Sequence, residues 1–271
     1  MKSLRFFAVF AVTAILVSCS QVPLTGRRQL SLIDDQALQQ QAVEAYRQFL
    51  SDPKTRVIRN SSETQRVKNV GSKIASAINR YMQSNGYGAK YNYNYEFNLI
   101  ESKDINAWCM PGGKVAVFKG LLAVTRDDAG LATVMGHEIA HAIAQHSAER
   151  FSQMTLAQAG GGVIGAAVGG RSQGTQQAVG QLYGLGGQLA LLKYSRNQES
   201  EADRLGLVFM AMAGYNPDNA VAFWQRMAAA KDGAGSPPEF LSTHPSDATR
   251  ISAIQKLLPE ARQYYTGAKR K

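Results

Sequence analysis

Apolar side chains recur every three or four residues in one early segment: Val67, Val70, Ile74, Ala77, Ile78 and Tyr81. This spacing places side chains on one face of a helix. Asn85 and Gly86 follow it and predict the helix end, because these residues tolerate the left-handed backbone that closes many helices. A second polar–apolar run extends from Asp34 to Leu50, and acids at its start favour a helix there.

A strict alternation then replaces the helical period, with heavy side chains at every second position: Tyr91, Tyr93, Tyr95, Phe97 and Leu99. This pattern predicts a strand whose aromatic face lies in the core. A Pro111-Gly112-Gly113 turn precedes a second short strand over 114–118. From Asp127 onward the pattern is almost wholly helical. The sequence therefore predicts an α+β fold, mostly helical, with a small sheet.

The first residues have the pattern of a targeting segment. Lys2 and Arg5 precede an apolar run that ends at Val17, and this run is too short for a membrane-spanning helix. Leu16-Val17-Ser18-Cys19 is similar to the lipobox of bacterial lipoproteins. We therefore expect a signal peptide at 1–18, lipid on Cys19 and a tether over 19–32, with one domain at 33–271. An ordinary secretory signal that happens to end in cysteine is the alternative.

Composition and net charge exclude few protein classes, but they bear on which binding partners are expected. The 271 residues have a formal net charge of +10, and the basic residues are scattered. No nucleic-acid motif accompanies them, so a solvated surface near anionic lipid is the favoured interpretation. Cys109 would have no partner if Cys19 is modified, and it is either a buried small apolar residue or a redox-sensitive thiol. The glycine-rich stretch 160–187 suggests a mobile lid.

Metal-binding chemistry is indicated at His137-Glu138-Ile139-Ala140-His141. Two imidazoles at positions i and i+4 lie on one helix face and can bind one Zn²⁺. Glu138 lies beside them and could take a proton from water. This short motif also occurs by chance in unrelated proteins, where the histidines are core or surface residues.

A second motif supplies the missing carboxylate. Glu199-Ser200-Glu201-Ala202-Asp203 lies in a segment that predicts a helix, with Glu199 and Asp203 on one face and Glu201 pointing elsewhere. Catalytic zinc takes three protein ligands and keeps one open position. Glu199 is a candidate third ligand, and Asp203 is a candidate acceptor for the free N–H of His137. The alternative is a solvated acidic helix turn.

The chain resembles the M48 family of zinc metallopeptidases, which includes integral-membrane enzymes and periplasmic lipoproteins. Besides the two motifs above, four stretches carry the resemblance: Thr243-His244-Pro245-Ser246, Asn106-Ala107-Trp108, Pro111-Gly112-Gly113 and Gly120-Leu121-Leu122. The resemblance implies a gluzincin-type fold and one Zn²⁺ per subunit, held by His137, His141 and Glu199. It implies Glu138 as the base.

The resemblance also implies further roles. An edge strand near 114–118 would pair with substrate backbone beside the active-site helix. His244 would cap the zinc or stabilise the oxyanion, or it could simply cap a helix. Asn106 would contact substrate, or stabilise a turn. Arg250 could orient His244 or bind a substrate carboxylate. His146 falls off the ligand face, and we expect it at the surface.

These observations predict a zinc-dependent endopeptidase, anchored through Cys19, that cleaves unfolded or misassembled exported proteins. The expected location is the periplasmic face of a bacterial outer membrane, less so the inner membrane. The sequence leaves the oligomeric state open and gives no sign of a nucleic-acid partner. Two rival functions remain: a non-catalytic chaperone-like or scaffold lipoprotein that uses the same groove, and a cell-wall peptide hydrolase.

Overall fold

The structure, a computed structural model, describes residues 19–159, 194–233, 239–244 and 248–265. The strands are β1 (Cys19–Gln21), β2 (Arg28–Leu30), β3 (Val57–Ile58), β4 (Glu96–Ile100), β5 (Ala107–Met110) and β6 (Lys114–Phe118). The helices are α2 (Asp35–Ser51), α3 (Ser62–Ser84), α4 (Lys119–Thr125), α5 (Asp128–Ile143), α6 (His146–Ala159), α9 (Arg196–Met212), α10 (Asn219–Gly233), α11 (Glu239–Thr243) and α12 (Ala248–Gln263). The predicted signal segment 1–18 and the glycine-rich segment 160–187 lie outside the described residues.

The main helices begin where side chains satisfy the free backbone N–H groups of the first turn. Asp34, Ser61 and Asp127 accept these hydrogen bonds at the starts of α2, α3 and α5. Ser195 and Gln198 form a reciprocal capping box at the start of α9. The helices predicted around 35–50 and 67–81 are confirmed, and the fold is mostly helical with small sheets, as expected.

The larger sheet has the order β3-β4-β6-β5, so the strand at 114–118 is internal and the prediction of an edge there is wrong. Strand β5 precedes the turn and pairs antiparallel with β6 after it, so β5 is the edge strand of this sheet. Gly112 and Gly113 make this hairpin possible, because their φ angles of 81° and 83° are costly for other residues. The strand predicted over 91–99 starts only at Glu96, because its partner β6 starts at Lys114.

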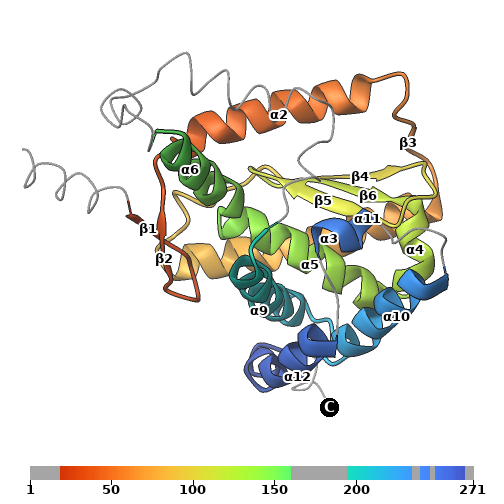
Figure 1. Cartoon of the computed structure of the whole chain (residues 1–271). Coiled ribbons are helices and arrows are strands. Elements are labelled where there is room, and N and C mark those ends of the chain that lie inside the picture. Colours follow the sequence, from red (N-terminus) through yellow and green to blue (C-terminus); the bar gives the residue numbers. More distant parts are fainter. Residues whose placement is uncertain (1–18, 160–193, 234–238, 245–247, 266–271) are drawn as a thin grey trace, which may run out of the picture.

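Both faces of this sheet are covered by helices. Alternate residues of β6 point to opposite sides: Val115 and Val117 join the core under α3 and α5, whereas Ala116 and Phe118 pack with α2. Figure 1 shows the same layering, with α2 on one side of the sheet and α3 and α5 on the other. The tyrosines of the 91–95 segment line the core, as the alternation predicted.

Helices α5 and α9 cross at a pair of glycines. A Cβ on Gly136 would lie 2.8 Å from the carbonyl oxygen of Gly206, and a Cβ on Gly206 would lie 2.8 Å from the amide nitrogen of His137. Real Cβ atoms do not come this close to backbone, so only glycine lets the two helices approach to this distance. The contact sets α9 directly against the histidine-bearing turn of α5.

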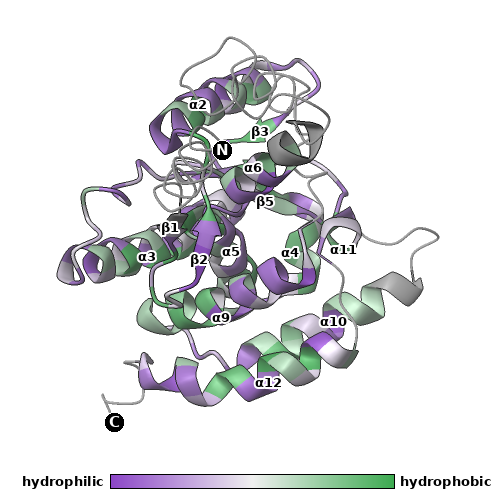
Figure 2. Cartoon of the chain, turned by 60° about the vertical axis from the view of Figure 1, so that its left-hand side comes forward, coloured by the Kyte–Doolittle hydropathy of each residue, from purple (hydrophilic) through white to green (hydrophobic). Residues whose placement is uncertain are grey.

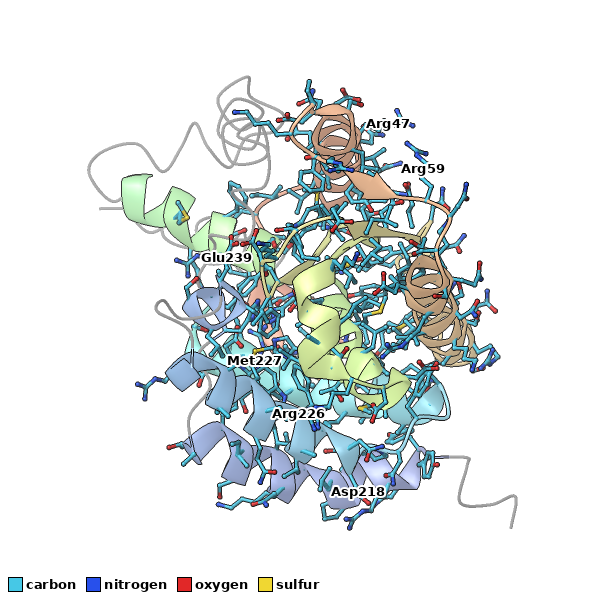
Figure 3. All side chains as sticks on the ribbon, turned by 90° about the vertical axis from the view of Figure 1, so that its right-hand side faces the viewer. Arg47, Arg59, Asp218, Arg226, Met227 and Glu239 are labelled. Carbon is cyan, nitrogen blue, oxygen red and sulfur yellow. The ribbon has the colours of Figure 1, made fainter. Side chains whose placement is uncertain are left out.

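The C-terminal helices cover α9 and α5. The buried face of α10 has helical spacing: Ala220, Phe223, Trp224 and Met227. Figure 2 shows green and purple sectors on both α10 and α12, as expected of helices with one buried face. Arg226 of α10 donates to the carbonyl oxygens of Val124 and Thr125 at 2.8 and 3.2 Å and ties α10 to α4 (Figure 3).

The first described residues form a hairpin of β1 and β2 that packs on the domain. Val22 at its turn is fully buried and belongs to the main core. Leu32, just after the hairpin, donates its backbone N–H to Ser152 of α6 at 3.0 Å. Among the described helices, none is long and apolar enough to cross a membrane.

Candidate metal centre

Four buried side chains bring their ligand atoms together at the crossing of α5 and α9. His137, His141, Glu199 and His244 each offer one atom within 4.8 Å of the others. The Nε2 atoms of His137 and His141 are 3.1 Å apart, and each lies 3.5 Å from an oxygen of Glu199. His244 Nδ1 lies 2.8 Å from Glu199 Oε1 and 3.2 Å from His137 Nε2.

Local helical geometry supplies most of this arrangement. His137 and His141 are one turn apart on α5, so their imidazoles project from the same face. Glu199, Asp203 and Gly206 share a face of α9 by the same rule, and the contact at Gly206 places that face against His137. His244 comes from the end of α11, far along the chain.

The residues fit Zn²⁺. Two imidazole nitrogens and one carboxylate are a donor set of catalytic zinc sites, and they are buried here, between 1% and 7% exposed. Glu199 Oε2 accepts no hydrogen bond from the described residues, although Arg250 Nη1 lies 3.2 Å away. Because the Arg250 guanidinium already faces this oxygen, the fit to Zn²⁺ rests on the buried donor atoms that converge on one point. Four protein atoms around one point leave room for a single ion.

His137 is held by a buried ion pair behind it. Its Nδ1 lies 3.0 Å from Asp203 Oδ1, so this nitrogen carries the proton and Nε2 faces the ligand cluster. Arg250 donates to both oxygens of Asp203 at 2.9 and 2.7 Å, and its guanidinium lies 3.6 Å above the Trp224 ring. Burial alone would raise the pKa of Asp203, but Arg250 and His137 lower it, so it stays a carboxylate.

His141 is held from a different side. Its Nδ1 lies 2.8 Å from Nδ1 of His146, whose Nε2 lies 3.0 Å from Glu201 Oε2. His146 is fully buried, so its predicted place at the surface is wrong. The error arose because His146 follows a break after α5 and starts α6, which turns its ring back under His141. Glu201 points away from the metal cluster, as predicted, and contacts His146 instead.

Glu138 has the environment of a base. It is 3% exposed, and its Oε1 accepts no hydrogen bond from the described residues, with His244 Nε2 at 3.5 Å. Burial raises the pKa of Glu138 to about 7, and His244 opposes the shift. A pKa in this range suits a general base, because the group must both accept a proton and release it again near neutral pH.

Burial and neighbouring charges also shift the pKa values of other carboxylates and imidazoles around the site. Burial lowers the pKa of His141 well below its usual range, so the ring is neutral and able to bind a metal. Burial alone would raise the pKa of Glu201, but hydrogen bonds from His146, Thr25 and Arg27 lower this pKa to about 2. Burial also acts to lower the pKa of His137, but its hydrogen bonds with Asp203 and Glu199 outweigh burial and raise that pKa. The neutral His141 ring is the form that ligates zinc.

A small cavity lies between the metal cluster and β5. Asn106, Cys109, Glu138, Tyr194 and His244 are among its lining residues, and it offers only about 20 Å³ to the centre of a water molecule. Asn106 is buried at the start of β5, where its side chain accepts from the amide of Ala107. The Cys109 thiol is half-buried, and burial raises its pKa well above the usual range.

The structure places Arg250 and Tyr194 where the sequence did not indicate. Arg250 does not line this cavity, because its guanidinium is turned onto Asp203 and Trp224, so a substrate carboxylate does not reach it there. Tyr194, which the sequence did not single out, stacks on His141 with ring centroids 4.0 Å apart. Its hydroxyl lies 3.1 Å from Ser147 Oγ. A lone tyrosine beside the glycine-rich stretch gave no periodic or motif signal.

Comparison with known sequences agrees with this geometry. Residues 61–258 match the family described as Peptidase family M48. The chain is 32% identical over 241 residues to the mitochondrial metalloendopeptidase OMA1 of Schizosaccharomyces pombe, covering 89% of this chain and 66% of that protein. It is 32% identical to bovine mitochondrial OMA1, covering 94% of this chain and 48% of that protein.

Bacterial proteins are also similar. A putative beta-barrel assembly-enhancing protease of Vibrio cholerae is 31% identical over 201 residues, covering 69% of this chain and 40% of that protein. The chain thus spans between 40% and 66% of the length of these relatives. The expected location at the periplasmic face of an outer membrane is contradicted, because the relatives aligned along most of the chain are mitochondrial enzymes.

Proposed function

The chain belongs to peptidase family M48, and from this premise we propose that it is a zinc-dependent endopeptidase acting on unfolded or misassembled polypeptides. One observation carries the proposal. His137, His141 and Glu199 converge on one point, and Glu138 stands beside it with a carboxylate oxygen that no described residue satisfies. A scaffold protein that used only the groove would have no need of this costly buried carboxylate.

The chain's own residues divide the catalytic work. Bound Zn²⁺ supplies Lewis acidity, which activates water and polarises the scissile carbonyl. Glu138 Oε1 takes the proton of the attacking water and passes it to the leaving amine. Asp203 and Arg250 hold His137 in the tautomer whose Nε2 faces the ion. We assign Arg250 to this positioning role.

His244 occupies a place that substrate needs. Its Nδ1 lies among the ligand atoms, and its Nε2 is 3.5 Å from Glu138, so the ring covers the base. The small cavity cannot hold a peptide while the ring stays there. We propose that His244 swings away to admit substrate and that its N–H then donates to the developing oxyanion.

In this proposal substrate backbone pairs with the outer edge of β5, which no other described strand pairs with. The edge strand lies directly beside the cavity, and Asn106 at its start can donate its amide to the peptide. In strand addition the substrate is bound mainly through hydrogen bonds to its main chain rather than through its side chains. The bound segment must be extended, which favours unfolded polypeptides. A casein-derived peptide that is N-methylated on alternate residues should be cleaved at least 10-fold more slowly. Equal rates for the two peptides would rule out pairing at this edge.

The decisive experiment compares the full chain with Glu138→Gln on unfolded casein, with and without a zinc chelator. We expect the variant to keep its zinc and to lose at least about 100-fold in rate, the usual contribution of a general base. Cleavage by the variant at the wild-type rate would refute the mechanism. A wild-type protein that binds casein without cutting it would support the scaffold function, and release of peptides from purified peptidoglycan alone would support the cell-wall hydrolase.

We also propose that Cys19 carries a lipid. The support is the sequence Leu16-Val17-Ser18-Cys19 and the apolar run before it. A diacylglyceryl group adds a characteristic mass and makes the protein partition into detergent. Intact-mass measurement of the protein purified from its native membranes tests this. A chain that retains residues 1–18, or a mature chain with an unmodified Cys19, would exclude lipidation.

A further inference from the structure

The hairpin of β1 and β2 sends one side chain into a buried charged cluster behind His141. Arg27, which precedes β2, donates to Glu201 Oε2 at 2.7 Å and to both oxygens of Glu149 at 2.7 and 2.9 Å. Thr25 donates its hydroxyl to the other Glu201 oxygen at 2.6 Å. Glu201 and Glu149 are 7% and 6% exposed, whereas the Arg27 side chain is 32% exposed, so the carboxylates are buried and the arginine covers them from the solvent side.

The cluster continues to the metal ligand through one imidazole. His146 lies between Glu201 and His141, with contacts of 3.0 Å to the carboxylate and 2.8 Å to the His141 ring. Both histidine contacts use ring nitrogens, and each neutral ring has one donor and one acceptor. The order of donors along the chain is therefore determined once one end is fixed.

Glu201 fixes that end, because a carboxylate only accepts hydrogen bonds. His146 must donate from Nε2, which leaves its Nδ1 as an acceptor. His141 must then donate from Nδ1, which leaves its Nε2 with a free lone pair. That nitrogen is the one that faces His137 and Glu199 in the ligand cluster.

We infer that Arg27, Glu201 and His146 form a positioning relay that holds His141 in the zinc-binding tautomer, so that the N-terminal hairpin is a working part of the metal centre. The inference rests on the proposed zinc site but does not depend on the substrate. Arg27 and Glu201 are 174 residues apart in sequence, and this contact is made only when the hairpin is docked. Undocking the hairpin would then weaken the zinc site without touching a ligand.

The test measures zinc affinity of the full chain by competition with a chromophoric chelator, which needs no peptidase activity. Outer contacts of this kind typically change metal affinity 10- to 100-fold. We expect that loss for His146→Leu and Glu201→Leu. His146→Asn keeps an acceptor for His141, and Glu201→Gln keeps an acceptor for His146, so both should recover most of the affinity.

Arg27→Met should weaken zinc binding at least 3-fold. Arg66→Met is its control, because the Arg66 side chain is similarly exposed, at 27% against 32% for Arg27, and its ion-pair partner Asp128 is not one of the metal-cluster residues. The melting temperature of each metal-free variant separates a general loss of stability from a loss of zinc affinity. Bound Co²⁺ gives an independent reading, since its visible absorption reports ligand geometry.

The inference is overturned if His146→Leu binds zinc within 2-fold of wild type. It is also overturned if His146→Asn and Glu201→Gln are as weak as their leucine counterparts, because packing rather than hydrogen bonding would then explain the loss. Should a leucine variant at one position fail to fold, the pair at the other position still decides. Failure of casein cleavage with normal zinc affinity in wild type would instead count against the proposed peptidase function alone.

Discussion

Burial of single ionisable residues controls the chemistry of this site. Glu138 shows this most clearly, because burial raises its pKa to about 7 from 4.5. A group whose folded-state pKa is raised contributes full stability below its unfolded pKa and loses it as the pH rises through the folded value. The window for Glu138 therefore runs from about pH 4.5 to about pH 7.

Glu138→Gln should thus stabilise the metal-free protein at high pH. The shift of Glu138 from 4.5 to about 7 corresponds to about 3 kcal/mol. We expect the free energy of unfolding of the variant to exceed that of wild type by up to this amount at pH 8, and the difference to vanish near pH 4.5. Urea denaturation in chelator at several pH values measures it. A difference that does not depend on pH would contradict the buried-carboxylate account.

Arg250 offers a second prediction at this scale. Replacement by methionine removes the charged partner of the buried Asp203 carboxylate and leaves it only the hydrogen bond from His137. Breaking a buried ion pair in this way typically costs about 3–5 kcal/mol. Arg250→Lys should recover only part of the loss, since an ammonium cannot make the paired contacts to Asp203 or stack on Trp224 in the same way. Urea denaturation of both variants, with Arg66→Met as the control, tests this. A loss below about 1 kcal/mol for Arg250→Met would argue against a buried pair.

At the scale of elements, the glycine contact between α5 and α9 decides how close the ligands come. An alanine at 206 gains up to about 1 kcal/mol in helix propensity. Its Cβ, however, would lie 2.8 Å from the backbone of His137, and overpacking of a rigid core costs about 1–3 kcal/mol. The steric cost should win, because the atom it meets is backbone and cannot rotate away.

Gly206→Ala should therefore lower both the free energy of unfolding and the zinc affinity. Asn197→Ala, at an exposed position of the same helix, is the matched control and should stay within about 0.5 kcal/mol of wild type. Calorimetry and chelator competition give the two readings. Unchanged zinc affinity in Gly206→Ala would mean that the helix spacing does not set the ligand geometry.

At the scale of the whole molecule, the metal links segments that are far apart in sequence. The side chains that could hold it come from α5, from α9 and from the residue that follows α11. A ligand that binds only the folded state stabilises it by about 4 kcal/mol when its free concentration is 1,000 times its dissociation constant. For a chain of this size that corresponds to roughly 10 °C in melting temperature.

Removal of zinc should lower the melting temperature by about that amount, and added zinc should restore it. Magnesium should not, because its preference is for oxygen ligands. Glu199→Gln should shrink the zinc-dependent shift relative to wild type. Differential scanning calorimetry with chelator, zinc and magnesium checks all three. Equal melting temperatures with and without zinc would mean that these residues do not hold the ion in the folded protein.

The sequence by itself determined what depends on neighbours along the chain. The zinc motif on α5, the shared face of Glu199 and Asp203, and the caps that start the helices all follow from residues a few positions apart, where helical geometry fixes the outcome. The mostly helical fold followed from the same periodicity. These features were predictable because each needs only local backbone rules.

Tertiary structure alone decided the rest. The edge position of β5, the burial of His146, the stacking of Tyr194 on His141 and the turn of Arg250 away from the cavity depend on contacts between distant segments. So does the docking of Arg27 onto Glu201. Local periodicity cannot show which segments meet, because that is settled by how the whole set of apolar faces packs together. Local sequence therefore predicts which side chains are candidate zinc ligands, whereas packing determines which residues contact those side chains.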